Sequence, residues 1–176
     1  QEEKKYLARS FYFILYQFLR YKYDNVEVVF ISHSTDAKEV NEEDFFQRGT
    51  MGGTIISSAL AMEKEIIQKR FHPSSWNIYT FYSGDGENWS FDNPKAVSLF
   101  EDLKNLSQMV CYAEIDPHNS SDHLGGSFSY SLRASTSQDN LWHELLPLVG
   151  EKFKLVKINK SSQIWPAFQT MFGDKK

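Results

Sequence analysis

The sequence predicts a single Rossmann-like α/β domain, in which a mostly parallel sheet carries helices on both faces. Three observations predict this fold class. Short runs of β-branched and aromatic residues alternate along the chain with segments of helical periodicity. The chain has 176 residues, which suffices for one domain with a sizeable core. It contains no internal repeat and no linker, so residues 1–176 are assigned to one domain.

The first part of the chain is predicted to form two long helices with a pair of short strands between them. Residues 3–22 and 54–71 place apolar side chains at helical spacing. Residues 26–31 form a β-branched run, which is typical of a buried strand, and residues 37–40 are expected to form a short partner strand. Asn41 is expected to cap one helical turn.

The second part of the chain continues the alternation. Strands are predicted at 76–82, 109–115 and 153–158, and helices at 93–105, 138–149 and 161–172. Alternating polar and apolar residues at 128–134 predict a further edge strand. Strands joined by helices favour a parallel sheet covered on both faces. Ligands bind such sheets at the carboxyl ends of the strands, so the loops that follow strands are the first place to look for function.

The composition excludes several classes of protein. The net charge is −4 and the isoelectric point about 5.7, which argues against a nucleic-acid binder and against docking on an anionic membrane. The single cysteine, Cys111, allows no disulfide within the chain, which suits the cytoplasm. The longest apolar-aromatic run, 11–16, is far shorter than the ~20 residues that span a bilayer. We therefore expect a soluble, cytoplasmic domain.

Two glycine-containing loops hold the side chains best suited to chemistry. In the segment 52–60, Thr54 follows Gly53 at the start of a helix, where its hydroxyl can reach a metal ion or the helix amides. In the segment 83–89, Asp85 directly follows a strand, and a carboxylate in that position suits a hard cation such as Mg²⁺ or Mn²⁺. Taken alone, Thr54 can equally be a helix cap and Asp85 a turn residue.

Several further residues are candidates for the rim of such a site. They flank the two loops or follow a strand: His33, Gly53, Ser83, Gly84, Gly86 and Asn88. His33 comes just after a predicted strand and is expected near the same edge as Asp85. It can equally be a histidine whose polar atoms are satisfied locally.

The order of these loops resembles that in von Willebrand factor A (vWA) domains. There, a threonine after a glycine turn and an aspartate at the end of the next central strand complete a metal-ion-dependent adhesion site. More closely, the stretches 9–12, 26–31, 37–40, 76–79, 85–89 and 164–168 resemble a bacterial family of unknown function that includes the sporulation-associated protein YhbH and its stress-linked relative YeaH. The resemblance implies a vWA-like cytoplasmic protein with a partial metal site at Thr54 and Asp85. It also implies a protein partner, with a serine-kinase-like ATPase as the candidate.

The chain departs from the vWA pattern in one respect. The first metal motif of those domains, Asp-x-Ser-x-Ser after the first central strand, does not occur in it. We therefore expect a vWA-like domain truncated at its N-terminus, with the first central strand missing. Two protein ligands fall short of the octahedral shell of Mg²⁺, so we expect the metal only in a full-length protein and none bound by this chain. Strand edges left open would favour self-association.

Three functions are compatible with these observations. The favoured one is a binding module of vWA type that engages a protein partner. The second is a metal-dependent hydrolase or phosphotransferase at the same edge, which would need further acidic ligands or a base beside Asp85. The third is an interaction domain that uses no metal. Loss of partner binding on replacing Asp85 would separate the first from the third.

Overall fold

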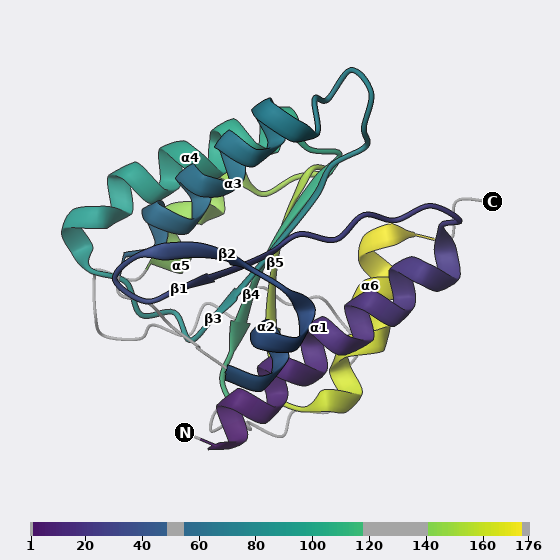
Figure 1. Ribbon diagram of the computed structural model, residues 1–176. Helices are drawn as coiled ribbons and strands as arrows, with labels where there is room; N and C mark the ends of the chain where they lie inside the picture. Colours follow the sequence, from purple (N-terminus) through teal and green to yellow (C-terminus); the bar gives the residue numbers. More distant parts are fainter. Residues whose placement is uncertain (1, 49–54, 118–140, 174–176) are drawn as a thin grey trace.

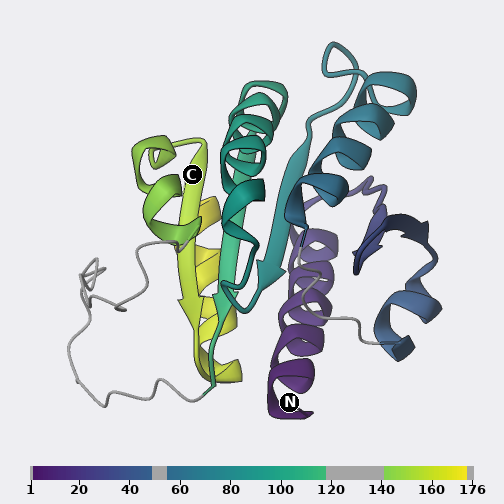
Figure 2. The ribbon, with the colours of Figure 1, turned by 90° about the vertical axis from the view of Figure 1, so that its left-hand side faces the viewer.

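The computed structural model describes residues 2–48, 55–117 and 141–173 and confirms the α/β class. Its main sheet has three parallel strands in the order β3 (Tyr79–Gly84), β4 (Met109–Ile115) and β5 (Phe153–Ile158). In this register Thr80 lies opposite Val110 and Tyr112 opposite Leu155. Figure 1 views the sheet nearly along its edge, and Figure 2 shows the three strands side by side, with β4 in the centre. Every residue of β4 is buried, as expected of a central parallel strand.

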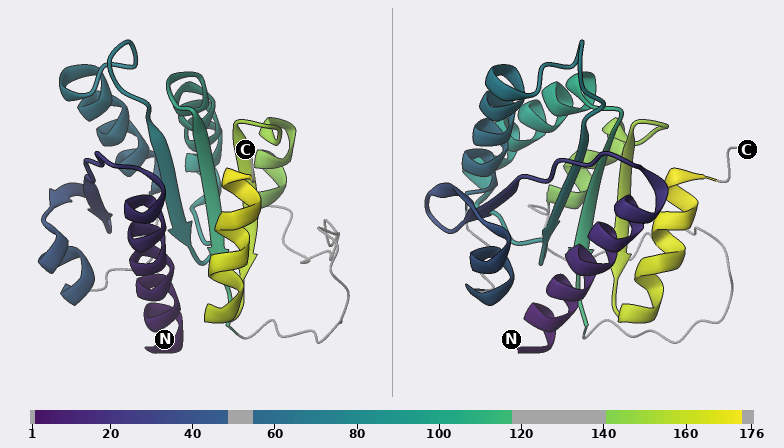
Figure 3. Two further views of the ribbon diagram at one scale, coloured as in Figure 1. Left: turned by 90° about the vertical axis from the view of Figure 1, so that its right-hand side faces the viewer. Right: turned by 45° about the vertical axis from the view of Figure 1, so that its right-hand side comes forward.

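Helices cover both faces of the sheet, as the sequence predicts. One face carries α3 (Ile56–Arg70), α4 (Asn93–Leu106) and α5 (Leu141–Leu145), and the other carries α1 (Glu2–Lys22) and α6 (Ile164–Phe172), as Figure 3 shows. Side chains of β4 alternate between the two sides. Val110 and Tyr112 join the core beneath α3 to α5, whereas Cys111 and Ala113 join the core beneath α1 and α6.

The helices α1 and α6 are held together by aromatic contacts. In α1, Phe11 and Phe18 lie on the buried stripe together with Leu7, Ala8 and Leu15. The ring of Phe11 lies 5.2 Å from that of Phe168, and Phe18 lies 5.3 Å from Trp165 and 4.9 Å from Phe172. Each such pair adds about 0.5–1.5 kcal/mol beyond the area it buries. The first and last helices of the described chain therefore form one layer.

The predicted strand at 26–31 is wrong in extent, whereas its predicted partner strand at 37–40 is confirmed. Residues 26–29 have no regular secondary structure, and β1 (Phe30–His33) pairs antiparallel with β2 (Ala37–Val40) in a separate two-stranded sheet. Pairing ends at Phe30 and Val40 because β2 has only four residues and the described chain offers 26–29 no other strand. The next element, α2 (Glu42–Arg48), begins as predicted: Asn41 Oδ1 accepts the Asp44 N–H at 2.7 Å.

The remaining boundaries differ from the predictions by a few residues. The strand β3 begins at Tyr79 and leaves Trp76 exposed. Short 3₁₀ turns adjoin three of the helices at Ser90–Asp92, Leu146–Leu148 and Ser161–Gln163. The predicted edge strand at 128–134 lies outside the described residues. No helix in the described part of the chain is long and apolar enough to cross a membrane.

A cavity separates β3 from the β1–β2 hairpin. Strand β3 forms an edge of the three-stranded sheet and does not pair with β1. The space between them has a volume of about 500 Å³ and is lined by residues of α1, the segment 25–33, α3 and β3. Figures 2 and 3 show the hairpin standing apart from the sheet at this edge. The two predicted strands therefore flank a gap.

Candidate binding edge at the carboxyl end of the sheet

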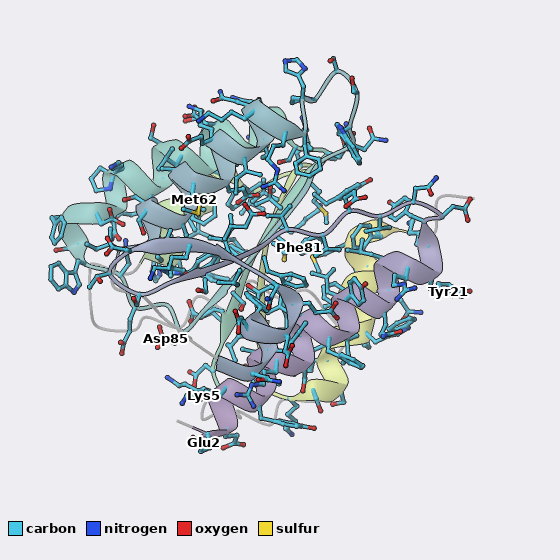
Figure 4. All side chains as sticks on the ribbon, viewed as in Figure 1. Glu2, Lys5, Tyr21, Met62, Phe81 and Asp85 are labelled. Carbon is cyan, nitrogen blue, oxygen red and sulfur yellow. The ribbon has the colours of Figure 1, made fainter. Side chains whose placement is uncertain are left out.

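Asp85 lies immediately beyond β3, where the sequence analysis placed it. Figure 4 shows its side chain past the carboxyl end of the strand, with Phe81 further back along the strand. Its Oδ1 accepts the N–H of Glu87 at 3.1 Å, so the carboxylate shapes its own turn. The turn passes through Gly86, whose φ of 85° is readily adopted only by glycine. The second carboxylate oxygen of Asp85 is not used by this turn.

The neighbouring strand adds a carboxylate that the sequence analysis missed. Glu114 lies near the end of β4 and is only 7% exposed. A Cβ atom on Gly86 would lie 2.9 Å from its Oε2, so the turn after β3 rests directly against this carboxylate. The signal that could have found it is a charged residue at the carboxyl end of an otherwise apolar strand. Parallel strands end at one edge, so this position lies beside Asp85.

The charge of Glu114 is incompletely balanced. Burial raises the pKa of its carboxyl, Lys157 lowers it, and the nearby carboxylates of Asp116 and Asp85 raise it further. The Lys157 Nζ lies 3.6 Å from Oε1 of Glu114. The other oxygen, Oε2, is buried and has no hydrogen-bond partner among the described residues. This edge therefore concentrates negative charge around an oxygen that is free to accept a donor or a cation.

Two tyrosines and His33 pack against one another next to this edge. Tyr82 stacks on Tyr112 with ring centroids 5.3 Å apart, and His33 lies 5.8 Å from Tyr82. The Tyr112 hydroxyl and the Nδ1 of His33 are also buried without a hydrogen-bond partner in the described part of the chain. Burial lowers the pKa of His33, and Asp92 opposes that shift. The structure thus places His33 near the end of β3, where its ring packs against that of Tyr82.

The loop after β3 contacts the start of α3 in the structure. Asn88, in the loop after β3, accepts the N–H of Ile56 at 3.1 Å through its Oδ1. Four residues later, Asp92 accepts the N–H of Ser57 at 3.0 Å and also the Ser57 hydroxyl. Because Ile56 and Ser57 open α3, the loop after β3 caps that helix. Thr54 and Gly53 themselves lie outside the described residues.

The other predicted rim residues have structural roles. Asn88 Nδ2 donates to Asp92 and Asn93, which fixes the cap of α3. The N–H of Ser83 donates to the hydroxyl of Tyr12 at 2.9 Å. A Cβ atom on Gly84 would lie 2.8 Å from the Tyr82 hydroxyl, so close approach of that ring requires glycine. Within the described part of the chain, none of these side chains forms a hydrogen bond with Asp85.

The described residues give limited support to a metal site or to an enzyme active site. Within residues 2–48, 55–117 and 141–173, no group of three or more histidine, cysteine, aspartate or glutamate side chains is arranged to hold a metal ion. Asp85 and Glu114 offer oxygen ligands of the kind that Mg²⁺ prefers. Burial raises the pKa of the Cys111 thiol, which disfavours the nucleophilic thiolate. The Ser57 hydroxyl donates to the carboxylate of Asp92, which also accepts the Ser57 N–H and Asn88 Nδ2 at the start of α3.

An exposed aromatic pair stands in the loop beyond Asp85. Trp89 is 51% exposed and Phe91 67% exposed, and their rings lie 5.1 Å apart in an edge-to-face arrangement. Exposed aromatic rings of this size are enriched in protein–protein interfaces. The loop that carries Asp85 therefore also carries a surface suited to a protein partner.

The fold and this edge define an α/β domain with a parallel sheet and a carboxylate-rich carboxyl end. The chain belongs to the bacterial family described as "Protein of unknown function (DUF444)", which matches residues 1–175.

Relatives of similar sequence carry the name UPF0229 protein. The chain is 45% identical over 170 residues to one from Ruminiclostridium cellulolyticum, covering 97% of this chain and 39% of the relative. It is 39% identical over 172 residues to one from Clostridium perfringens, and 36% identical over 178 residues to one from Legionella pneumophila. These alignments cover 98% and 99% of this chain and 40% and 38% of the relatives. The chain thus spans about two fifths of their length. No solved structure matches it significantly.

Proposed function

We propose that this chain is a protein-interaction module of vWA type, which binds its partner at the carboxyl end of the parallel sheet. The observation that carries the proposal is the hydrogen bond from Ile56 to Asn88. It joins the start of α3 to the loop of Asp85, and this supports the proposal because Thr54 lies two positions before α3 in the sequence. A vWA-type site needs these two loops together.

A divalent cation would link the module to its partner. Asp85 and Thr54 would hold Mg²⁺ or Mn²⁺ in a full-length protein, and the ion would bridge to a carboxylate of the partner. The unpartnered oxygen of Glu114 supports a cation at this edge, because a buried carboxylate oxygen without a hydrogen-bond partner can be satisfied by an ion. The aromatic pair of Trp89 and Phe91 would add apolar contact beside the ion.

The resemblance to the YhbH and YeaH family supports a biological setting for this proposal. The module would act in the bacterial cytoplasm, in sporulation or the response to stress. Its partner would be a serine-kinase-like ATPase. The negative charge around Glu114 favours a partner surface that supplies a cation or basic side chains next to its own carboxylate.

The test removes the negative charge of Asp85 and keeps the turn that this residue forms with Glu87. In the complete gene product, Asp85→Asn retains an oxygen that can accept the Glu87 N–H, whereas the carboxylate is lost. We expect at least a tenfold weaker affinity for the purified ATPase, measured by calorimetry in Mg²⁺, and a similar loss for the unaltered protein in EDTA. The metal contributes only if both changes weaken binding.

The matched control is Glu87→Gln, which removes a charge from an exposed residue of the same loop. We expect it to leave the affinity within twofold of the unaltered protein, and thermal unfolding should show that both variants are folded. Equal affinity of Asp85→Asn and the unaltered protein would contradict a metal-dependent module. It would leave the metal-free interaction domain as the better description.

A further inference from the structure

The outer side of α1 exposes three aromatic rings. Tyr6 is 65% exposed, Phe13 57% and Tyr21 83%. Their spacings along the helix, seven and eight positions, place side chains on one face. The buried stripe of α1 lies on its other side, so these rings add nothing to the core. Exposed apolar side chains that gather in this way mark interaction sites on soluble proteins.

The helix α6 extends this exposed aromatic face. Its Trp165 is 39% exposed, and the ring lies 5.3 Å from that of Phe18 in α1. Figure 3 shows α1 and α6 next to each other on the same face of the sheet. Exposed rings of two packed helices therefore belong to one continuous surface.

Only positive charges accompany these rings. Residues 6–22 contain Arg9, Arg20 and Lys22 but no aspartate or glutamate, and residues 164–172 contain no charged residue. The two glutamates of α1 lie in its first turn, before Tyr6. The chain as a whole is acidic, with a net charge of −4. The outer face of α1 and α6 therefore differs in sign from the rest of the molecule.

The two arginines on this face are held in place without a carboxylate. Arg9 donates to the Gln47 carbonyl at 3.2 Å, and the guanidinium of Arg20 lies 5.4 Å from the centre of the Tyr16 ring. Among the described residues neither arginine forms an ion pair, whereas several cations of α3 pair with carboxylates. A partner carboxylate could thus be added to cations whose side chains are already ordered, which lowers the entropic cost of binding.

We propose that this face of α1 and α6 binds an acidic segment of a partner protein. Carboxylates of the segment would lie beside the arginines, and its apolar side chains would pack on the rings. Tyrosine, tryptophan, phenylalanine and arginine are the residue types enriched in protein interfaces. The aromatic–basic surface comprises Tyr6, Arg9, Phe13, Arg20, Tyr21 and Trp165.

This surface is separate from the carboxyl end of the sheet. It is formed by the outer sides of two helices, whereas Asp85 lies in the loop after β3. The proposal therefore goes beyond the metal-dependent module and does not depend on it. It would stand if Asp85 had no role in binding.

Other occupants fit the aromatic–basic surface less well. Recognition of anionic lipid uses clusters of about 4–8 basic residues, whereas residues 6–22 carry only three on a chain of net charge −4. The same shortage of cations weighs against nucleic acid, which is bound through many phosphate contacts. In a symmetric dimer the surface would face its own copy, so like charges would meet.

Photo-crosslinking in growing cells tests the proposal. Phe13 is replaced in the complete gene product by the photoreactive analogue p-benzoylphenylalanine, and cross-linked peptides are identified by mass spectrometry. Glu101, which is exposed on α4 at the other face of the sheet, is replaced in the same way as the control. We expect the Phe13 position, and not the Glu101 position, to cross-link to a peptide of another protein that has a net negative charge. Cross-links only to lipid, to nucleic acid, to the same polypeptide or to neutral or basic peptides would overturn the proposal, as would the absence of any cross-link at Phe13.

Charge reversal tests the role of the arginines. Arg9→Glu combined with Arg20→Glu should lower the yield of the Phe13 cross-link about tenfold, because carboxylates would then face carboxylates. The control combines Lys95→Glu with Lys104→Glu on α4, which changes the net charge equally, and should leave the yield within about twofold. Thermal unfolding should show that both variants are folded. Arg9→Gln with Arg20→Gln removes the charges without reversing them and should lower the yield less. Equal yields from the arginine variants and the unaltered protein would overturn the proposal.

Discussion

Glu63 is a half-buried residue whose carboxyl group lies on the wall of the cavity. It accepts the hydroxyl of Thr80, which in turn lies 3.0 Å from that of Ser107. Burial raises the pKa of Glu63 from 4.5 to about 7, and the bond from Thr80 opposes that shift. A raised pKa means that the folded state binds the proton more tightly than the unfolded state. The stability that comes from this proton is complete below pH 4.5 and is lost as the pH rises through about 7.

Glu63→Gln is therefore expected to stabilise the chain of residues 1–176 at alkaline pH. The amide imitates the protonated carboxyl and keeps an oxygen for Thr80, so the free energy of unfolding at pH 8 should rise by roughly 1–3 kcal/mol. Near pH 4.5 the variant and the unaltered chain should be nearly equal. Denaturant unfolding at both pH values measures this. A gain of the same size at both would show that the pKa of Glu63 is not the cause.

Gly86→Ala tests the turn that rests on Glu114. A side chain at a φ of 85° costs about 1–2 kcal/mol, and its Cβ would lie 2.9 Å from Glu114 Oε2. We expect a loss of roughly 2 kcal/mol in the free energy of unfolding. Gly150→Ala is the matched control, since a Cβ there has no atom within 4 Å. If the two variants unfold alike, the turn does not contact Glu114 as described.

Residue types alone could predict only part of the candidate edge. Asp85 was recognisable because a carboxylate between two glycines follows a strand. Glu114 was not, because its position beside Asp85 depends on the pairing of β3 with β4. Asn88 was assigned to the rim, whereas it caps a helix that begins 32 positions earlier. The contacts that define such roles join residues that no local pattern connects.

At the scale of elements, the loop after β3 and the start of α3 form one unit. Asp92 is 4% exposed and accepts hydrogen bonds from the backbone and hydroxyl of Ser57 and from Asn88. Its carboxylate also lies at the N-terminus of α3, where the helix dipole favours negative charge. The conformation of this edge of the sheet therefore depends on Asp92, which lies outside both glycine-containing loops.

Asp92→Ala should lower the free energy of unfolding by about 2–4 kcal/mol, because it leaves buried donors of Ser57 and Asn88 without an acceptor. Chemical denaturation measures the loss. Asp102→Ala is the control: Asp102 pairs with Lys64 at 2.9 Å but is 42% exposed, and such pairs contribute about 0.5 kcal/mol. Similar losses in the two variants would argue that Asp92 is no more than a surface charge.

Elements with a strong local pattern were predicted well. The run Met109–Ile115 is apolar until its end and is a buried strand, and α4 starts near Pro94 as expected. The run at 26–31 has an equally suitable composition, yet only its last two residues are in a strand. A strand needs a partner as well as β-branched residues. No strand of the described residues pairs with residues 26–29.

At the scale of the whole molecule, the open edge of β3 should affect association. No strand of the described residues pairs with this edge, so it is available to a second copy. We expect sedimentation velocity to show a monomer that forms dimers as its concentration rises. Val29→Lys places a charge on the cavity wall and should shift the equilibrium to the monomer, whereas Tyr21→Lys, at a site that is 83% exposed, should not. If the chain stays monomeric at all concentrations, the edge of β3 does not mediate self-association.

The pairing of α1 with α6 has a consequence for synthesis of the chain. Lys22 donates to the carbonyl of Phe172, a residue 150 positions later, and Phe11 packs on Phe168. The ribosome makes α1 before α6, so Phe11 and Phe18 lack the rings of Phe168 and Phe172 until α6 has emerged. Contacts of such long range form slowly, and apolar surface exposed in the meantime is prone to aggregation. A nascent chain that stalls before Ile164 would therefore be a natural substrate for chaperones.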